Sequence, residues 1–476
     1  MQKDSFFSRL NTLWGIKKEF LSKVLLQSLT FLFMTACLVI WRPLKMSIFS
    51  KMVGPTYVPN AKIYSLLILI PLILLYSKLV DWFRRHHLLY YFTILHGIGG
   101  CFFYILFSHP VYGIANTQTD PFRYLGWAFY FFMESFDAFF STTFWSFVDS
   151  INNPKDAKNH YGFFVTGSKI GGILSSGGLY LILHFCSTEN QTMMLPKALL
   201  FGSIMLFSAA VSVYYLIKNV PENIMHGYEV VYQLETKKHS KSSGFLQSFK
   251  GSFQGLILII KNPYVLGIFS LVIFYEIMVV VFDYRVIIDA NNIYKTPGKM
   301  TAFYALYYLI YNVLGLFISF LGTTPLLRIL GIRISLFMFP ILVLILLLVT
   351  FFFPFSWVLI GTLIGLRALN YSLNHPTREI LYIPTTKDIK FKAKSWTDAF
   401  GSRIAKSIGS LFNISIQGIT PAIGLTISVG LGLGLTSLWL IIIYFLGKTL
   451  QEAINDKRII GDKKNPNKIN KEISLT

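Results

Sequence analysis

The sequence predicts an all-α polytopic membrane protein with twelve transmembrane helices in two six-helix bundles. The first reason is composition: 54% of the 476 residues are hydrophobic and only 14% are charged, whereas soluble proteins carry about 25% charged residues. The second reason is pattern, because the apolar residues form runs long enough to cross a hydrocarbon core of about 30 Å and lack the two-residue alternation of a barrel. Backbone groups in lipid must bond within their own segment, so these runs are expected to be helices.

The expected spans follow one another along the whole chain. They are 24–43, 61–80, 88–108, 124–148, 161–186, 193–217, 264–288, 301–322, 330–352, 355–376, 397–420 and 422–446. The polar and basic N-terminus shows no secretory signal, and most Lys and Arg residues fall in connections on one side of these spans. By the positive-inside rule that side is the cytoplasm, so we expect both termini to be cytoplasmic and the protein to lie in a bacterial inner membrane.

The longest polar connection, 218–262, follows the sixth span and divides the chain into halves. We therefore expect an N-terminal bundle over 1–217, a cytoplasmic linker over 218–262, a C-terminal bundle over 263–447 and a basic cytoplasmic tail over 448–476. Two six-helix halves are typical of major-facilitator transporters. A trace of repetition agrees, because Gly-Ser-Lys-Ile opens the fifth span and Gly-Ser-Arg-Ile opens the eleventh.

Charged residues inside the spans carry the functional information, because a charge in lipid is costly. The basic ones are Arg42, Lys45, Lys62, Lys169, Arg285, Arg367, Arg403 and Lys406, and the acidic ones are Glu134, Asp137, Asp149, Glu276 and Asp283. Those at span ends, such as Lys62 and Arg285, are equally compatible with snorkelling to the interface. Glu134, Glu276 and Lys406 lie deeper and favour a cavity, with a structural ion pair as the alternative.

A basic cavity attracts polyanions, and the forked donors of arginine suit phosphate oxygens. We therefore predict that the substrate-binding residues are Arg42, Lys45, Lys62, Arg403 and Lys406. Carboxylates among these cations can pair with them while the site is empty, or take up protons. The predicted gating and coupling residues are Glu134, Glu276, Asp137 and Arg285, in a central site between halves that work by alternating access.

Other classes of function find little support in the sequence. It contains no Gly-rich phosphate loop, zinc-protease motif or nucleophile elbow, so we expect no enzyme activity, no cofactor and no metal. The net charge of +21 belongs largely to the connections and tail, where it meets anionic lipid heads rather than nucleic acid. A membrane sensor would carry a sizeable soluble output domain, which is not visible here. We expect a functional monomer.

Four segments in order resemble the non-mitochondrial nucleotide transporter family, the ATP/ADP translocases of plastids and intracellular bacteria. Trp-Arg-Pro-Leu-Lys at 41–45 is similar to its Leu-Arg-Asp-x-Lys-Asp motif, and 57–62 is similar to its Ile-Pro-Phe-Leu-Lys entry to the second span. Glu134 with the following 143–162 looks like its fourth span and loop, and 382–409 is similar to its tenth-to-eleventh-span segment.

The resemblance implies that Lys62, Glu134, Glu276 and Lys406 correspond to charges that the family needs for nucleotide exchange. Pro43 and Met46 replace both acidic residues of the first motif. This departure bears on the adenylate specificity more than on the anion preference. The predicted function is therefore nucleotide transport, as ATP/ADP exchange or nucleotide uptake. The alternative is a proton-coupled transporter of another organic anion, such as NAD or a different phosphorylated metabolite.

Overall fold

The computed structural model describes residues 18–152, 154–221, 255–321, 323–386, 388–456 and 458–461. Most of the expected linker (222–254) and the end of the tail (462–476) therefore lie outside the described residues. Within the described residues the chain is helical and forms no strand, apart from an isolated bridge between Thr385 and Ile460. The all-α prediction is confirmed for this part of the chain.

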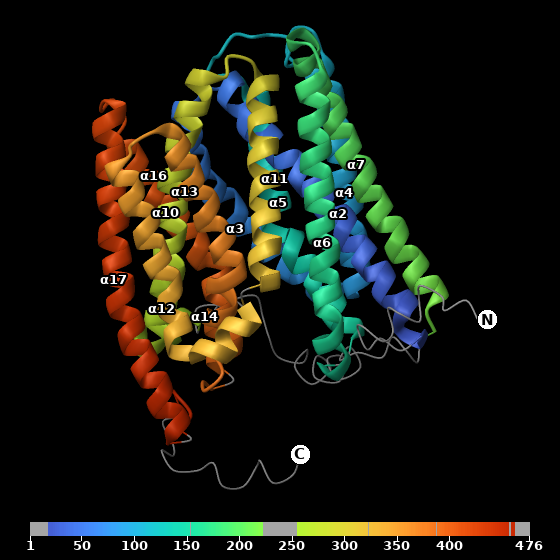
Figure 1. Cartoon of the computed structure of the whole chain (residues 1–476). Helices are drawn as coiled ribbons and strands as arrows, with labels where there is room; N and C mark the ends of the chain where they lie inside the picture. The colour runs from blue at the N-terminus through green and yellow to red at the C-terminus, as the bar shows by residue number, and fades with distance from the viewer. Residues whose placement is uncertain are drawn as a thin grey trace, which may run out of the picture. The chain divides into compact units, whose positions relative to one another are not determined.

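Long helices make up most of the described chain (Figure 1). In chain order the first six are α2 Lys18–Met52, α3 Val58–Trp82, α4 Arg85–Ser108, α5 Tyr124–Ile151, α6 Pro154–Phe185 and α7 Thr188–Asn219. The later ones are α10 Pro263–Ile293, α11 Pro297–Leu321, α12 Thr323–Phe352, α13 Ser356–Leu369, α14 His375–Leu381, α15 Lys394–Trp396, α16 Ser402–Ser415 and α17 Pro421–Asn455. Short π-helical segments, Asn370–Asn374 and Thr397–Gly401, precede α14 and α16.

Eight helices in the described residues are long and apolar enough to cross a membrane, which makes the chain an integral membrane protein. They are Phe20–Met52, Pro55–Ile73, Arg85–Ser108, Asn190–Asn219, Pro263–Ile293, Pro297–Ile318, Arg333–Phe352 and Pro421–Asn455. The other four expected spans coincide with α5, α6, the broken α13–α14 segment and α16. These helices are shorter, or they carry charged residues, glycine and serine that lower their mean hydropathy. Twelve membrane crossings therefore stay a prediction.

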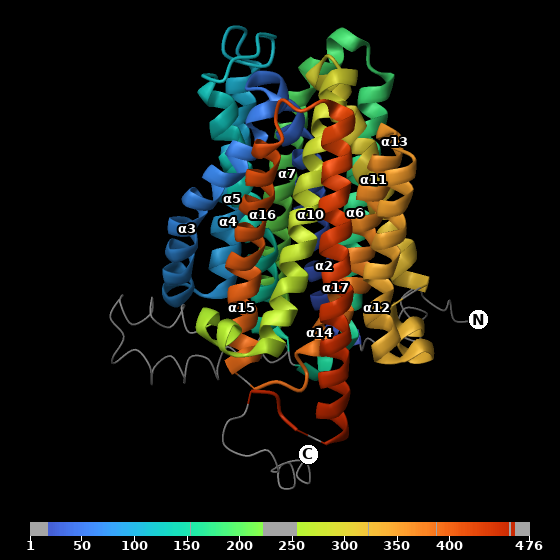
Figure 2. The ribbon, with the colours of Figure 1, turned by 90° about the vertical axis from the view of Figure 1, so that its left-hand side faces the viewer.

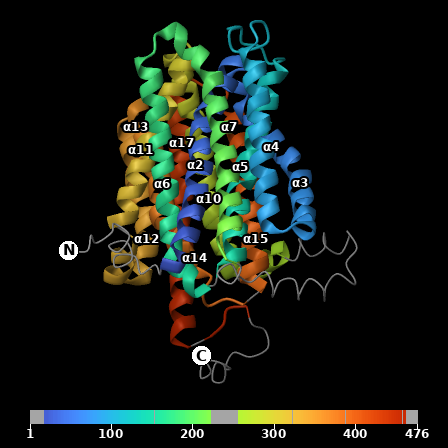
Figure 3. The same ribbon diagram turned by 90° about the vertical axis from the view of Figure 1, so that its right-hand side faces the viewer.

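The helices gather into two compact units. The first takes Met1–Lys241 and Ala290–Asn312, and the second takes Ser242–Asp289 and Val313–Thr476, as far as these ranges are described. In the first unit α2 is central and packs against α5, α6 and α7 (Figure 3). In the second unit α10 lies between α16 and α17 (Figure 2).

The two Gly-Ser tetrapeptides lie at matching places in the two units. Gly167 of α6 faces Ser28 of α2 so closely that a β-carbon would overlap the serine hydroxyl. Gly401, just before α16, faces Phe269 of α10, whose ring would lie 2.7 Å from such a β-carbon. Each glycine thus lets its helix approach the central helix of its own unit, as small residues do between membrane helices.

A second pair of glycines repeats this relation at the same spacing along the central helices. Gly202 of α7 faces the fully buried Trp41 of α2, whose Nε1 donates a hydrogen bond to the backbone oxygen of Leu199, 3.2 Å away. Gly432 of α17 faces the fully buried Phe282 of α10. The internal repeat is therefore visible in packing contacts as well as in sequence.

Gly202→Ala is expected to lower stability by about 1–3 kcal/mol, the usual cost of overpacking a core. The added methyl would overlap the indole of Trp41, which its hydrogen bond and close packing hold in place. Gly432→Ala is the matched control, because its methyl would stop 3.1 Å from Phe282 and cost less. Thermal unfolding of both variants in one detergent measures the difference. Equal losses would contradict the tighter fit around Trp41.

Candidate functional site

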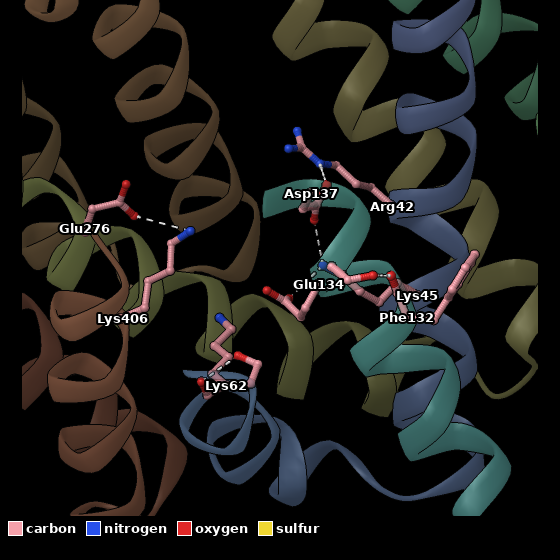
Figure 4. Close-up of polar contacts among 10 residues, drawn as sticks. Arg42, Lys45, Lys62, Phe132, Glu134, Asp137, Glu276 and Lys406 are labelled. Atoms are coloured by element: carbon pink, nitrogen blue, oxygen red, sulfur yellow. Dashed lines mark hydrogen bonds and ion pairs between the residues drawn. The ribbon is translucent and has the colours of Figure 1, made fainter. Parts of the chain in front are cut away.

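Four charged side chains from α2 and α5 form an inner charge cluster, Arg42, Lys45, Glu134 and Asp137 (Figure 4). Arg42 and Lys45 are three residues apart on α2, and Glu134 and Asp137 are three residues apart on α5. This spacing places each pair on one face of its helix, so two cations meet two carboxylates.

Lys45 is the centre of the cluster. Its Nζ donates to Glu134 Oε1 and to Asp137 Oδ2, each at 2.9 Å, and lies 5.4 Å from the ring centre of Tyr130. Its side chain is only 5% exposed, and those of both carboxylates are 19% exposed. An ammonium buried so deeply needs the two carboxylates, because breaking a buried pair leaves an uncompensated charge.

Arg42 is the most exposed member of this cluster, and Lys62 lies on the helix that packs against α5. Arg42 donates from Nε to Asp137 Oδ1 over 3.1 Å, and its side chain is 30% exposed, more than the other three members. Lys62 is half-buried near the start of α3, which packs against α5, and its backbone oxygen accepts a hydrogen bond from Ser65. The structure thus brings Arg42 and Lys45 together with both predicted carboxylates of α5, and places Lys62 on the adjoining helix.

A second site in the other unit is built around Glu276 of α10 (Figure 4). Ser402 Oγ of α16 donates to Glu276 Oε1 at 2.9 Å, while Lys406 Nζ lies 3.9 Å from Glu276 Oε2. The Lys406 side chain is 44% exposed and that of Glu276 is 18% exposed. Arg403 is half-buried on the same helix. The Lys406–Glu276 contact is therefore loose, at the limit of an ion pair, and leaves the ammonium accessible.

Asp283 and Arg367 form a further ion pair in this unit, which the sequence predictions did not assign to the site. Arg367 Nη2 of α13 donates to Asp283 Oδ1 of α10 at 2.9 Å, and the two side chains are 17% and 12% exposed. Asp283 follows Glu276 by two helical turns and shares its face of α10. That spacing of two acidic residues was the signal in the sequence that could have joined this pair to the site.

Matching hydroxyl hydrogen bonds join α2 to α6 in the first unit and α10 to α16 in the second. Thr35 Oγ1 of α2 donates to Ser168 Oγ of α6 at 3.1 Å. The equivalent contact in the second unit is the hydrogen bond from Ser402 of α16 to Glu276 of α10. Both serines follow the glycine of the repeated tetrapeptide. A neutral threonine thus occupies in the first unit the place that a carboxylate takes in the second.

Two turns further along each central helix, an ion pair joins it to the next repeat-related helix. The first unit has Arg42 on α2 and Asp137 on α5, and the second has Asp283 on α10 and Arg367 on α13. The sign of the charges is reversed between the two. The repeat therefore preserves where ion pairs form but exchanges which helix carries the cation.

Arg285, predicted as a coupling residue, does not join Glu276. It lies two residues beyond Asp283 and points to the opposite side of α10, because two residues turn an α-helix by about 200°. There its Nε donates to Ser428 Oγ of α17 over 3.4 Å. The structure thus separates Arg285 from the carboxylates with which the sequence grouped it.

Groups of three or more His, Cys, Asp and Glu side chains suited to a metal ion are not found in the part of the chain that the structure describes. The charged clusters instead have the composition of an anion site: ammonium and guanidinium groups, each balanced by carboxylates. Such pairs can exchange a carboxylate for a phosphate oxygen, because both are oxyanions that accept charge-assisted hydrogen bonds.

Solved transporter structures share the fold of this chain at low sequence identity. A bacterial homologue of the iron transporter ferroportin in its inward-facing state matches with a TM-score of 0.60 and 14% identity, covering 91% of this chain and 100% of that one. A D-xylose–proton symporter matches with a TM-score of 0.58 and 14% identity, covering 89% and 97%. These likenesses support the major-facilitator-like fold.

Closer relatives are found among curated sequences. The "ADP,ATP carrier protein 4" of Rickettsia typhi is 25% identical over 457 residues, covering 86% of this chain and 87% of its own length. That of Rickettsia prowazekii is equally similar, with the same coverage. The sequence profile of the family described as "TLC ATP/ADP transporter" matches residues 122–365 and 355–450, well over half of the chain. The resemblance seen in the sequence motifs is therefore confirmed, and the chain belongs to the TLC ATP/ADP transporter family.

Proposed function

We propose that this protein is a membrane carrier that exchanges nucleotides, ATP against ADP, by alternating access. The observation that carries the proposal is the loose contact of 3.9 Å between Lys406 Nζ and Glu276 Oε2, with the Lys406 side chain 44% exposed. A cation held this weakly in an apolar helix bundle is ready to leave its carboxylate for a better acceptor. A nucleotide phosphate is such an acceptor, because it offers several charged oxygens to one ammonium.

Every predicted site residue except Arg285 has a role in this proposal. Phosphate oxygens bind the five cations of the proposed site, which are Arg42, Lys45, Lys62, Arg403 and Lys406. Glu134 and Asp137 neutralise Arg42 and Lys45 while the site is empty, and Glu276 neutralises Lys406. An empty carrier with these ion pairs formed is stable and changes state slowly, whereas a bound nucleotide releases the carboxylates. A ligand shifts a conformational equilibrium only by such a difference in its interactions with the two states.

The membrane arrangement is part of the same proposal. We propose twelve spans in two six-helix bundles, 1–217 and 263–447, joined by a cytoplasmic linker over 218–262 and followed by a cytoplasmic tail over 448–476. The basic connections support cytoplasmic termini in a bacterial inner membrane. The carrier acts as a monomer, and its basic segments meet anionic lipids and no nucleic acid.

Uptake of labelled ATP into cells that express the protein tests this function. The wild type is expected to take up ATP, and internal ADP is expected to accelerate uptake. Lys406→Ala and Glu134→Ala are each expected to lower the rate at least tenfold, because one removes a phosphate contact and the other leaves Lys45 with a single carboxylate. Lys448→Ala, an exposed lysine near the end of α17, is the matched control. Unchanged uptake in both site variants would refute the assignment.

A proton-coupled carrier of another organic anion, such as NAD or a different phosphorylated metabolite, is the second candidate. The loss of two acidic residues from the first-span motif, at Pro43 and Met46, favours it, because the site is more basic than the family pattern. Exchange driven by internal ADP without a pH gradient would exclude this candidate. Uptake that collapses with the proton gradient and ignores internal ADP would select it over ATP/ADP exchange.

A further inference from the structure

Arg285 is a buried cation that makes no ion pair at contact distance with a carboxylate in the part of the chain that the structure describes. Arg285 as a whole is 9% exposed, and its Nη2 atom is buried without a hydrogen-bond partner. The contact from Nε to Ser428 Oγ, at 3.4 Å, is long. Asp289, one turn further along α10, is the neighbouring carboxylate that acts on Arg285 from beyond ion-pair distance, and its Oδ2 accepts a hydrogen bond from Ser356 Oγ at 2.7 Å. Such a guanidinium is costly inside an apolar bundle unless something neutralises it.

The guanidinium points at the first turn of α17. A β-carbon on Gly424 would lie 2.7 Å from the central carbon Cζ of Arg285 and would overlap Nη2. Glycine at this position therefore gives the guanidinium room to lie directly against the helix backbone. Any larger residue would push it away.

The first turn of α17 is itself electropositive. Its N-cap residue, Thr420, makes no side-chain capping hydrogen bond, and Pro421 begins the helix. Pro421 has no N–H and the Gly424 N–H donates to the Thr420 backbone oxygen, so the N–H groups of Ala422 and Ile423 are the ones without a partner within the helix. The dipole of a helix this long adds partial positive charge there. A guanidinium against such an end is repelled, so two independent positive features meet at one place, and the neighbouring Asp289 forms no ion pair with the guanidinium.

We propose that Arg285 and the first turn of α17 form a binding site for a phosphate-type oxyanion. The anion would accept hydrogen bonds from Arg285 and from the first-turn backbone N–H groups, an arrangement that helix N-termini make readily. Arginine favours tetrahedral oxyanions over halides because its donors are forked. The site lies on the side of α10 opposite Glu276, so it is distinct from the proposed cluster around Lys406. Its occupant is either free phosphate or a phosphate group of the nucleotide.

Thermal unfolding of the purified protein tests the site without any transport. In sodium gluconate, inorganic phosphate is expected to raise the midpoint of the wild type by several degrees, because a ligand of the folded state stabilises it. Arg285→Gln should require at least tenfold more phosphate for the same rise. In gluconate alone its midpoint should match or exceed that of the wild type, since the variant lacks an unpaired buried charge. Gly424→Ala, which keeps every charge and fills the space, should also weaken the response.

The same measurement with ADP in place of phosphate identifies the source of the anion. If Arg285→Gln loses the response to phosphate and keeps that to ADP, the site holds free phosphate. If it loses both, the site holds a phosphate group of the nucleotide. Either result supports the site. The response to inorganic phosphate tests the site even if the protein transports no nucleotide. No shift of the wild type by phosphate, a larger shift with chloride, or equal shifts in wild type and both variants would overturn it.

Discussion

Lys45→Met is expected to abolish nucleotide exchange and to destabilise the protein by about 3–5 kcal/mol, the cost of removing one partner from a buried ion pair. Lys45 contacts both carboxylates of the inner charge cluster, and it is almost fully buried. Without it, Glu134 and Asp137 face each other with Arg42 as their remaining cation in the cluster. Methionine matches the length of the aliphatic stem, so the loss reports the charge rather than a cavity.

A double variant separates stability from function. Lys45→Met with Glu134→Gln restores the charge balance of the cluster and should recover more than half of the lost stability, while exchange should stay undetectable. Arg42→Met is the comparison on the same helix face, and it should cost less stability because Lys45 still neutralises Asp137. Unfolding midpoints and ATP uptake in the same preparations measure both quantities. A stable, fully active Lys45→Met variant would disprove the central role of this lysine.

The sequence predicted the helical class, the positions of most helices and the charges that lie within them. Hydropathy sufficed to predict spans such as 264–288, because a long apolar run in lipid satisfies its backbone hydrogen bonds only as a helix. It did not predict the break between α13 and α14 or the π-helical segment before α16. Those depend on local backbone hydrogen bonding, which composition does not report.

The site was predictable in part. Arg42, Lys45, Glu134 and Asp137 were singled out by their cost in a membrane, and the structure brings them together. Arg285 is also a charged residue within a span, yet helical geometry places its side chain on the side of α10 opposite Glu276 and Asp283. Hydropathy identifies a charged residue within a span but does not tell which side of the helix its side chain faces. That side depends on how the helix is rotated relative to its neighbours.

Asp283→Asn is expected to destabilise the protein by about 3 kcal/mol, because it leaves the Arg367 guanidinium mostly buried opposite a neutral group. The double variant Asp283→Arg with Arg367→Asp should recover most of that loss. It recreates across α10 and α13 the polarity that Arg42 and Asp137 show in the first unit. Unfolding midpoints of the wild type, Asp283→Arg, Arg367→Asp and the double variant form a double-mutant cycle that measures the coupling.

The swapped pair should nevertheless leave exchange below a tenth of the wild-type rate. A cation at position 283, paired across to position 367, would still place positive charge two turns from Glu276 on the same face of α10, and its field would favour the charged carboxylate without the help of Lys406. Glu276 would then remain neutralised when the nucleotide binds, and the release that drives the conformational change would be lost. Restored exchange in the swapped variant would instead mean that the Asp283–Arg367 pair only holds α10 against α13 and has a structural role. The reversed polarity of the two units would then have no part in transport.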